Sequence, residues 1–245
     1  MSSNIWTLTE VDSNSEKFDS ITYRFTSSDG RVAIQEVSNS TRTVDIVEKV
    51  LYQHRSMNTV STGNLHRILA TPFERVDPEW TTRFRGAYDP GVYYCAESVE
   101  TAACEFGFHK LSNFLKASPD LERLETNIIM VTAAISTKGL DIRLPPYSKH
   151  NKVLQSVNDY SRTQELGRVA RSAEIGAITY KSARGETSGA CVAILRPSAF
   201  KNSQPSALKY SWHLTVFDNK ALWNDSEDSA SMEFEYSPQH GFRAS

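Results

Sequence analysis

Arg83, Tyr94 and Glu105 stand at equal spacings of eleven in one compact block of the chain, TRFRGAYDPGVYYCAESVETAACEF. An arginine fork binds a phosphate or a carboxylate, a tyrosine ring stacks on a planar group, and a carboxylate stabilises a developing positive charge. Ser182, in the later segment TYKSARGETSG, adds a hydroxyl that could hydrogen-bond a ligand or cap a turn. These residues are either unrelated surface positions or the wall of one pocket.

Glu105 is expected in a helix over residues 99–116, for which Ser98 is the N-cap. Its neighbours in TAACEF are small or apolar, and a carboxylate beside apolar groups needs a polar partner. Small residues also let a ligand or another segment approach the helix closely. A solvated helix glutamate is the alternative interpretation.

Arg83 and Arg85 flank Phe84 in an expected loop. Either they are surface arginines or they form a guanidinium fork for a phosphate or carboxylate. Tyr93 and Tyr94 point to opposite faces of their strand, so one can lie in the core while the other faces a cleft.

Alternating and apolar patterns predict strands, and amphipathic patterns predict helices, without a regular β-α-β repeat. The expected strands lie at residues 21–25, 31–37, 91–97, 127–135, 175–184, 189–197 and 208–217, and further helices at 43–55, 65–70 and 161–174. The run NIIMVTAAI has too few polar positions for a strand wetted on one face, which indicates a buried central strand. We therefore predict an α+β fold, built on a mixed or antiparallel sheet with flanking helices.

The length of 245 residues suits one large domain, or one domain with extensions. We expect an N-terminal extension over residues 1–60, with strands and one helix packed on the main domain and a loose arm at residues 1–19. The main domain is expected over residues 61–223. The acidic and polar tail at residues 224–245 is expected to end in disorder.

Composition excludes several classes of protein. Apolar residues make up 39% and charged residues 23%, with both signs interspersed. The formal net charge is −2 and no basic stripe is visible along the sequence, so binding to nucleic acid is not expected. The longest apolar run is far shorter than the roughly 20 residues that a membrane helix needs. Three widely spaced cysteines and a polar N-terminus without a signal pattern indicate a cytoplasmic protein.

Several kinds of site are also excluded. The histidines and cysteines lack zinc-site spacings, so no metal is expected. The chain contains no GxGxxG, GxxxxGK[ST] or GxSxG pattern, which removes the usual dinucleotide, P-loop and serine-hydrolase sites.

The progression RFR, GVYYCAES, TAACEFGFHK and ITYKSAR resembles the RES-domain proteins, a family named for an Arg, a Glu and a Ser. Arg83, Tyr94, Glu105 and Ser182 match the family's residues in identity and order, and TAACE is the most specific piece. The resemblance covers roughly residues 65–197.

A further upstream arginine, often followed by an aromatic residue, is typical of that family. In TPFERVDPEW the first candidate is Arg75, although Val76 stands where the aromatic is expected. Arg67, in HRIL, is the alternative.

The resemblance implies a fold similar to the ADP-ribosyltransferases and cleavage of the nicotinamide–ribose bond of NAD+, with water or phosphate as acceptor. NAD+ is then the substrate, and no cofactor is expected. A protein ADP-ribosyltransferase is the alternative, and a catalytically inactive binding module is the second alternative. The family also implies a toxin that forms a homo-oligomer in complex with an antitoxin, which carries an Xre-type helix-turn-helix domain.

The resemblance also implies a role for each site residue. Glu105 stabilises the cation that forms on the ribose, or positions the substrate, while Arg83 and the upstream arginine grip the pyrophosphate. Tyr94 stacks on nicotinamide or ribose, and Ser182 hydrogen-bonds the nicotinamide–ribose end.

Overall fold

The structure is a computed structural model that describes residues 5–27, 60–74, 81–117, 123–184, 189–237 and 241–244. The strand expected at 31–37, the helix expected at 43–55 and the candidate Arg75 lie outside the described residues. Among the helices of the described part, none is long and apolar enough to cross a membrane.

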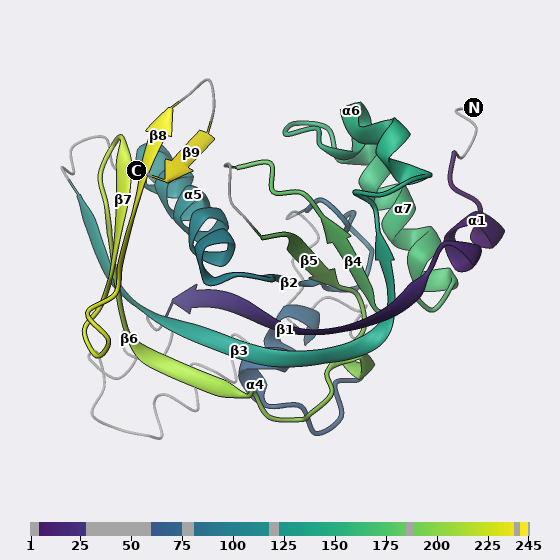
Figure 1. Cartoon of the computed structure of the whole chain (residues 1–245), viewed down its shortest axis with the longest axis horizontal. Coiled ribbons are helices and arrows are strands. Elements are labelled where there is room, and N and C mark those ends of the chain that lie inside the picture. Colours follow the sequence, from purple (N-terminus) through teal and green to yellow (C-terminus); the bar gives the residue numbers. More distant parts are fainter. Residues whose placement is uncertain are drawn as a thin grey trace.

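The described strands form one nine-stranded sheet in the order β1-β2-β5-β4-β3-β6-β7-β8-β9 (Figure 1). Their bounds are β1 Glu16–Ser27, β2 Tyr93–Ala96, β3 Leu124–Asp141, β4 Ala177–Tyr180, β5 Cys191–Ile194, β6 Ala207–Val216, β7 Lys220–Asp225, β8 Ser231–Ser237 and β9 Gly241–Ala244. Among these strands β3 and β4 run parallel, and the other neighbours run antiparallel. The predicted α+β fold with a mixed sheet is confirmed.

Strand β3 is the centre of this sheet, as predicted for the apolar run at 127–135. One edge pairs with the whole of β1, while the other edge pairs with β6 near its start and with β4 at its end. Because β1 also pairs with β2 at Tyr23 and Ala96, strands β1, β2, β5, β4 and β3 close into a ring. We call these five strands the strand ring.

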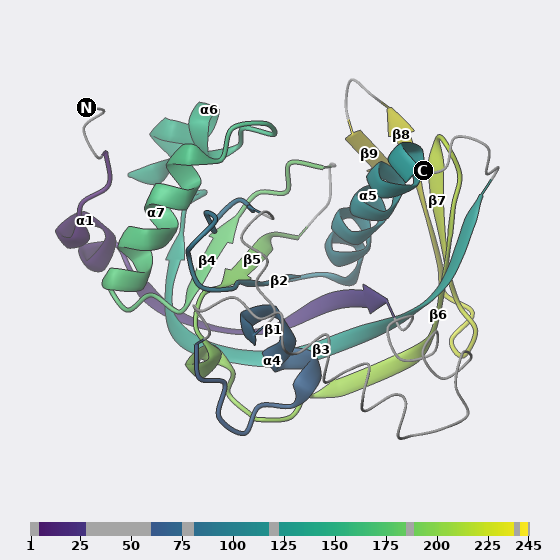
Figure 2. The same cartoon turned by 180° about the vertical axis from the view of Figure 1, so that it is seen from behind.

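Five helices lie around the sheet: α1 Leu8–Ser13, α4 Arg67–Glu74, α5 Val99–Ala117, α6 Asn151–Leu154 and α7 Ser161–Ser172, within the described residues. Figure 1 shows α5 beside β7, β8 and β9, whereas α6, α7 and α1 lie beside the opposite end of the sheet. The ends of β4 and β5 lie between these two groups. Helix α4 packs against β2, and it lies on the side of the sheet that the view from behind presents (Figure 2).

The short strands β4 and β5 are apolar on both faces. Cys191 and Ala193 belong to the core cluster beneath α7, while Val192 and Ile194 belong to the cluster that α4 covers. This alternation follows from the two-residue period of a strand. It also separates the predicted tyrosine pair, because Tyr93 is in the cluster under α4 and Tyr94 packs against the one beneath α7.

A cluster of aromatic rings supports α5, the helix that carries Glu105. The rings of Phe25 and Trp223 lie 4.6 Å apart, and Phe106 on α5 lies 5.9 Å from Trp223. A Cβ at Gly107 would lie 3.5 Å from Trp223 Nε1, so the helix backbone approaches this indole closely. Trp223 is fully buried, and it therefore fixes the height of α5 above the sheet.

Two expectations about the termini are wrong. Residues 5–19 are not a loose arm, because α1 and the start of β1 lie there and the buried Trp6 donates its indole N–H to the carbonyl of Arg162. The tail at 224–245 contains the end of β7, all of β8 and β9. Apolar and polar residues alternate in SMEFEYS as in a strand, although the segment as a whole is acidic. Phe234, one of the apolar residues, is buried against the aromatic cluster.

Replacing Trp223 by alanine should lower the free energy of unfolding by about 3–5 kcal/mol, because a large buried aromatic leaves a cavity. Denaturation in urea measures the change. Tyr210→Ala is the control, since this side chain is 64% exposed on β6 and its loss should change little. Equal effects of the two substitutions would contradict the role given to Trp223.

Candidate active site

Glu105 and Ser182 meet in a hydrogen bond that joins two distant parts of the chain. The Ser182 hydroxyl donates to Oε1 of Glu105 at 2.5 Å. Ser182 is buried and Glu105 is half-buried, so the carboxylate lies at the boundary between the interior and solvent. A short hydrogen bond to a carboxylate is typical of a charge-assisted contact. The structure thus brings together two of the residues that the sequence singled out.

The direction of this bond is set by the backbone that follows Ser182. The N–H of Arg184 donates to the Ser182 oxygen at 3.1 Å, and the serine proton is left for the carboxylate. The hydroxyl therefore closes a local turn and serves the site at the same time.

The start of α5 is held as the sequence predicts. Ser98 Oγ accepts a hydrogen bond from the N–H of Thr101 at 3.2 Å, which confirms the N-cap. Gly189, just before β5, approaches this turn so closely that a Cβ there would lie 2.7 Å from Ser98 Oγ. Glycine at this position lets β5 and the helix that carries Glu105 lie side by side.

Arg83 lies on the other side of the site and is buried. Its Nη1 donates to the carbonyl of Leu154 at 2.7 Å. Its guanidinium carbon lies 5.0 Å from the centre of the Tyr160 ring and 5.7 Å from that of Tyr180. Both distances are those of a cation–π contact. Among the contacts of the described residues, none joins Arg83 directly to Glu105.

Arg184 and Tyr160, which the sequence analysis did not select, connect Arg83 to the Ser182–Glu105 pair. Arg184 Nη2 donates to the Tyr160 hydroxyl at 2.9 Å, and its guanidinium stacks 4.2 Å above the Phe108 ring on α5. A continuous series of contacts therefore runs through five residues, which we call the contact chain: Arg83, Tyr160, Arg184, Ser182 and Glu105.

Tyr94 has a different place from the one expected of a stacking ring. Its hydroxyl accepts a hydrogen bond from the N–H of Phe84 at 3.1 Å and shares another with Thr82 Oγ1 at 2.8 Å. These contacts hold the two residues that flank Arg83, Phe84 through its backbone and Thr82 through its side chain. Stacking of Tyr94 on a ligand stays a prediction, and the contacts found are those of a residue that positions Arg83.

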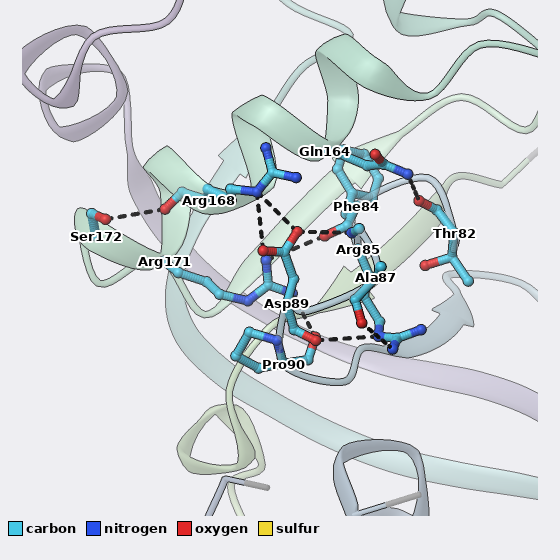
Figure 3. Close-up of polar contacts among 11 residues, drawn as sticks. Thr82, Phe84, Arg85, Ala87, Asp89, Pro90, Gln164, Arg168, Arg171 and Ser172 are labelled. Atoms are coloured by element: carbon cyan, nitrogen blue, oxygen red, sulfur yellow. Dashed lines mark hydrogen bonds and ion pairs between the residues drawn. The ribbon is translucent and has the colours of Figure 1, made fainter. Parts of the chain in front are cut away.

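The segment at residues 82–90, which we call the arginine loop, is fastened to one face of α7 (Figure 3). Gln164 donates to the carbonyl of Thr82, and Arg171 donates to the carbonyls of Phe84 and Pro90. Arg168 and Asp89 form an ion pair at 3.0 Å. The face of α7 formed by these residues thus fixes the loop from which Arg83 projects.

Arg85, the second candidate for a guanidinium fork, serves the loop itself. It is buried, and it donates to the carbonyls of Asp89 and Ala87 at 3.2 and 3.3 Å. Figure 3 shows these bonds beside those of Asp89 and Arg171. Arg83 is therefore the arginine of the pair that joins the contact chain. Arg67, the alternative upstream arginine, is exposed on α4.

Two buried groups next to Glu105 are neutral. Burial raises the pKa of the Cys191 thiol well above its ordinary value, and the negative charge of Glu105 raises it further. Burial likewise raises the pKa of the Tyr180 phenol well above its ordinary value.

The site therefore combines the carboxylate of Glu105, the guanidinium groups of Arg83 and Arg184, and neutral hydrogen-bond donors. Three aromatic rings lie beside the guanidinium groups: Tyr160, Tyr180 and Phe108. This set suits an anionic ligand with a cationic or hydroxyl-bearing end. Among the described residues, no cluster of His, Cys, Asp and Glu could hold a metal ion.

The protein is thus an α+β protein whose mixed sheet carries a serine just after β4, beside a carboxylate on α5 and two arginines. A family model described as the RES domain matches residues 61–215, which is more than half of the chain. The chain therefore belongs to the RES-domain family. No curated protein matches the chain.

Among solved structures, the chain is similar to the one titled crystal structure of the M. tuberculosis MbcT-MbcA toxin-antitoxin complex. The TM-score is 0.48 at 13% identity, and the match covers 82% of this chain and 89% of that chain. A likeness of this size says nothing about activity. The predicted domain boundaries at residues 60 and 223 stay predictions, although β1, which precedes the family match, is part of the strand ring.

Gly167 on α7 gives a test of how the arginine loop is held. A Cβ at this position would lie 2.7 Å from the carbonyl oxygen of Phe84, which is backbone and moves only with the loop. We expect Gly167→Ala to destabilise the protein by about 1–3 kcal/mol and to speed amide hydrogen exchange across the loop. Ser172→Ala, on the exposed side of the same helix, is the control. Unchanged exchange in Gly167→Ala would show that α7 does not hold the loop.

Proposed function

We propose that this protein cleaves the nicotinamide–ribose bond of NAD+, as a glycohydrolase with water as acceptor or as a phosphorylase with phosphate. The observation that carries the proposal is the carboxylate of Glu105, hydrogen-bonded by the buried Ser182 and linked through Arg184 and Tyr160 to Arg83. Membership of the RES-domain family supports the same activity. NAD+ is the substrate here, and no further cofactor is invoked.

Cleavage of the nicotinamide–ribose bond requires a negative charge close to the ribose. When the C1′–N bond breaks, its electron pair leaves with nicotinamide, which departs as a neutral molecule. The ribose acquires positive charge, as in the cleavage of other glycosides. A carboxylate held in place before the reaction stabilises this charge without reorganising at that moment. Glu105 has this role in the proposal, and no strong general acid is needed for a neutral leaving group.

The arginines would hold the rest of the dinucleotide. A guanidinium has five N–H donors, and one of those of Arg83 goes to the carbonyl of Leu154 within the described residues. The remaining donors suit the pyrophosphate, for which planar guanidinium groups are well adapted. Ser182 hydrogen-bonds the carboxylate and lies where the nicotinamide–ribose end would bind. The upstream partner expected at Arg75 remains part of the proposal.

Glu105→Gln should lower the rate of nicotinamide release by about 10²–10³-fold, because the stabilising charge is lost while the shape is kept. Purified protein is incubated with NAD+, and free nicotinamide is measured by chromatography. Glu125→Gln is the matched control, since Glu125 lies on β3 and forms an exposed ion pair with Arg123, just before this strand.

The products separate the candidate functions. Free ADP-ribose indicates hydrolysis, and ADP-ribose 1-phosphate formed with phosphate indicates a phosphorylase. Label that moves from NAD+ to protein indicates an ADP-ribosyltransferase. Neither turnover nor binding of NAD+ by the unmodified protein would leave the catalytically inactive binding module. Equal rates for Glu105→Gln and Glu125→Gln would refute the role of Glu105.

Family membership also supports a toxin that is restrained by an antitoxin with an Xre-type helix-turn-helix domain, and a homo-oligomer within that complex. Induced expression of the unmodified chain should halt growth and lower cellular NAD+, because consumption would exceed synthesis. Glu105→Gln, expressed to the same soluble level, should do neither. Normal growth with the unmodified chain present at high level would count against a toxin.

A further inference from the structure

The two oxygens of the Glu105 carboxylate have different surroundings. Ser182 Oγ donates to Oε1 at 2.5 Å, and Cys191 Sγ donates to the same Oε1 at 3.5 Å. Within the described residues, no hydrogen bond to Oε2 is found. The terminal torsion of a glutamate is broad and roughly two-fold, so a carboxylate without such contacts samples many orientations. Two donors that converge on one oxygen select one of them.

Cys191 is placed to act on the carboxylate by the sheet. It is the first residue of β5, and it pairs with Ala96 of β2 on one side and Tyr180 of β4 on the other. It is fully buried, so the sulfur has no alternative partner in water. Its thiol comes from a rigid strand, whereas Ser182 lies in the segment that follows β4. The carboxylate is therefore held by two donors, one from β5 and one from the segment after β4.

The state of the thiol fits donation. Burial and the charge of Glu105 raise its pKa well above the ordinary value, so the proton stays on sulfur at neutral pH. A protonated thiol is a weak hydrogen-bond donor and a poor nucleophile. This argues for a hydrogen bond to the carboxylate and against covalent chemistry at Cys191.

We propose that Cys191 is a positioning residue for the reaction. Its thiol donates to Oε1 of Glu105 and, together with Ser182, turns Oε2 toward the ribose of bound NAD+. The inference rests on the proposed function, since it specifies how the carboxylate of that site is oriented. Oε2 is then the oxygen that faces the positive charge in the transition state, and Cys191 does not touch the substrate.

The chain contains a matched control for this inference. Cys104 is as buried as Cys191, each being 1% exposed, and it stands next to Glu105 in the sequence. Its pKa is raised to about 12 by burial first and by Glu105 second, but it makes no hydrogen bond to that carboxylate among the described contacts. Cys104→Ala thus removes the same thiol from an equally buried position, but it takes no hydrogen bond away from the Glu105 carboxylate.

The test compares steady-state nicotinamide release by the unmodified protein, Cys191→Ala, Cys191→Ser and Cys104→Ala, with thermal unfolding of each. We expect Cys191→Ala to lower kcat by about tenfold, the effect of losing one hydrogen bond to a charged group, with KM within about twofold because the bond acts mainly in the transition state. Cys191→Ser should restore most of kcat, since the hydroxyl is again a donor. Cys104→Ala should keep kcat and share the change in unfolding temperature.

The outcomes separate this inference from the proposed function. No release by the unmodified protein defeats the proposed function and the inference with it. Release by the unmodified protein, with Cys191→Ala as active as Cys104→Ala, overturns the positioning role alone. Equal losses of kcat in Cys191→Ala and Cys191→Ser also overturn it, because a donor would then be present without effect.

Discussion

The hydrogen bond between Ser182 and Glu105 is the contact on which the rest of the site depends. A carboxylate beside alanine, cysteine and phenylalanine loses part of its hydration, and hydrogen-bond donors must offset the loss. The donor comes from the segment after β4, which is distant from α5 in the sequence. The bond therefore joins the helix seated on the aromatic cluster to the strand ring. Arg184, Tyr160 and Arg83 follow in order from the same serine.

The arginine loop shows how one short segment divides its charges between structure and site. Arg83 and Arg85 have the same side chain and are two residues apart, yet Arg85 donates to carbonyls of its own loop and Arg83 joins the contact chain. Arg171 approaches the loop from α7 and donates to two more carbonyls. The hydrogen bonds of Arg85 and Arg171 to these carbonyls fix the backbone of the arginine loop. The side chain of Arg83 therefore projects from the loop in a defined direction.

Sequence patterns predicted the helices and strands that are long or have a clear periodicity. They also identified several residues of the site, but not how those residues are arranged. The helix after Ser98, the apolar central strand and the pair β4–β5 are confirmed, since periodicity and capping are local properties. Strand β8 was missed because its glutamates alternate with the buried Phe234 and the half-buried Met232 and Tyr236 in a polar context. Tyr160 and Cys191 could not be found in this way, because their roles arise from segments that meet only in the folded chain.

The closed ring of strands has a consequence for pairing register. In β5 both faces are apolar, so sliding the strand by one residue would still bury hydrophobic side chains and meet little opposition from the core. Such a slip would nevertheless turn Val192 toward Glu105 and send the thiol of Cys191 under α4. Because β5 is hydrogen-bonded on both sides within a circuit that returns to β3, a shift of one partner would require a shift of all. Closure of the circuit thus specifies what residue polarity leaves ambiguous in these four-residue strands.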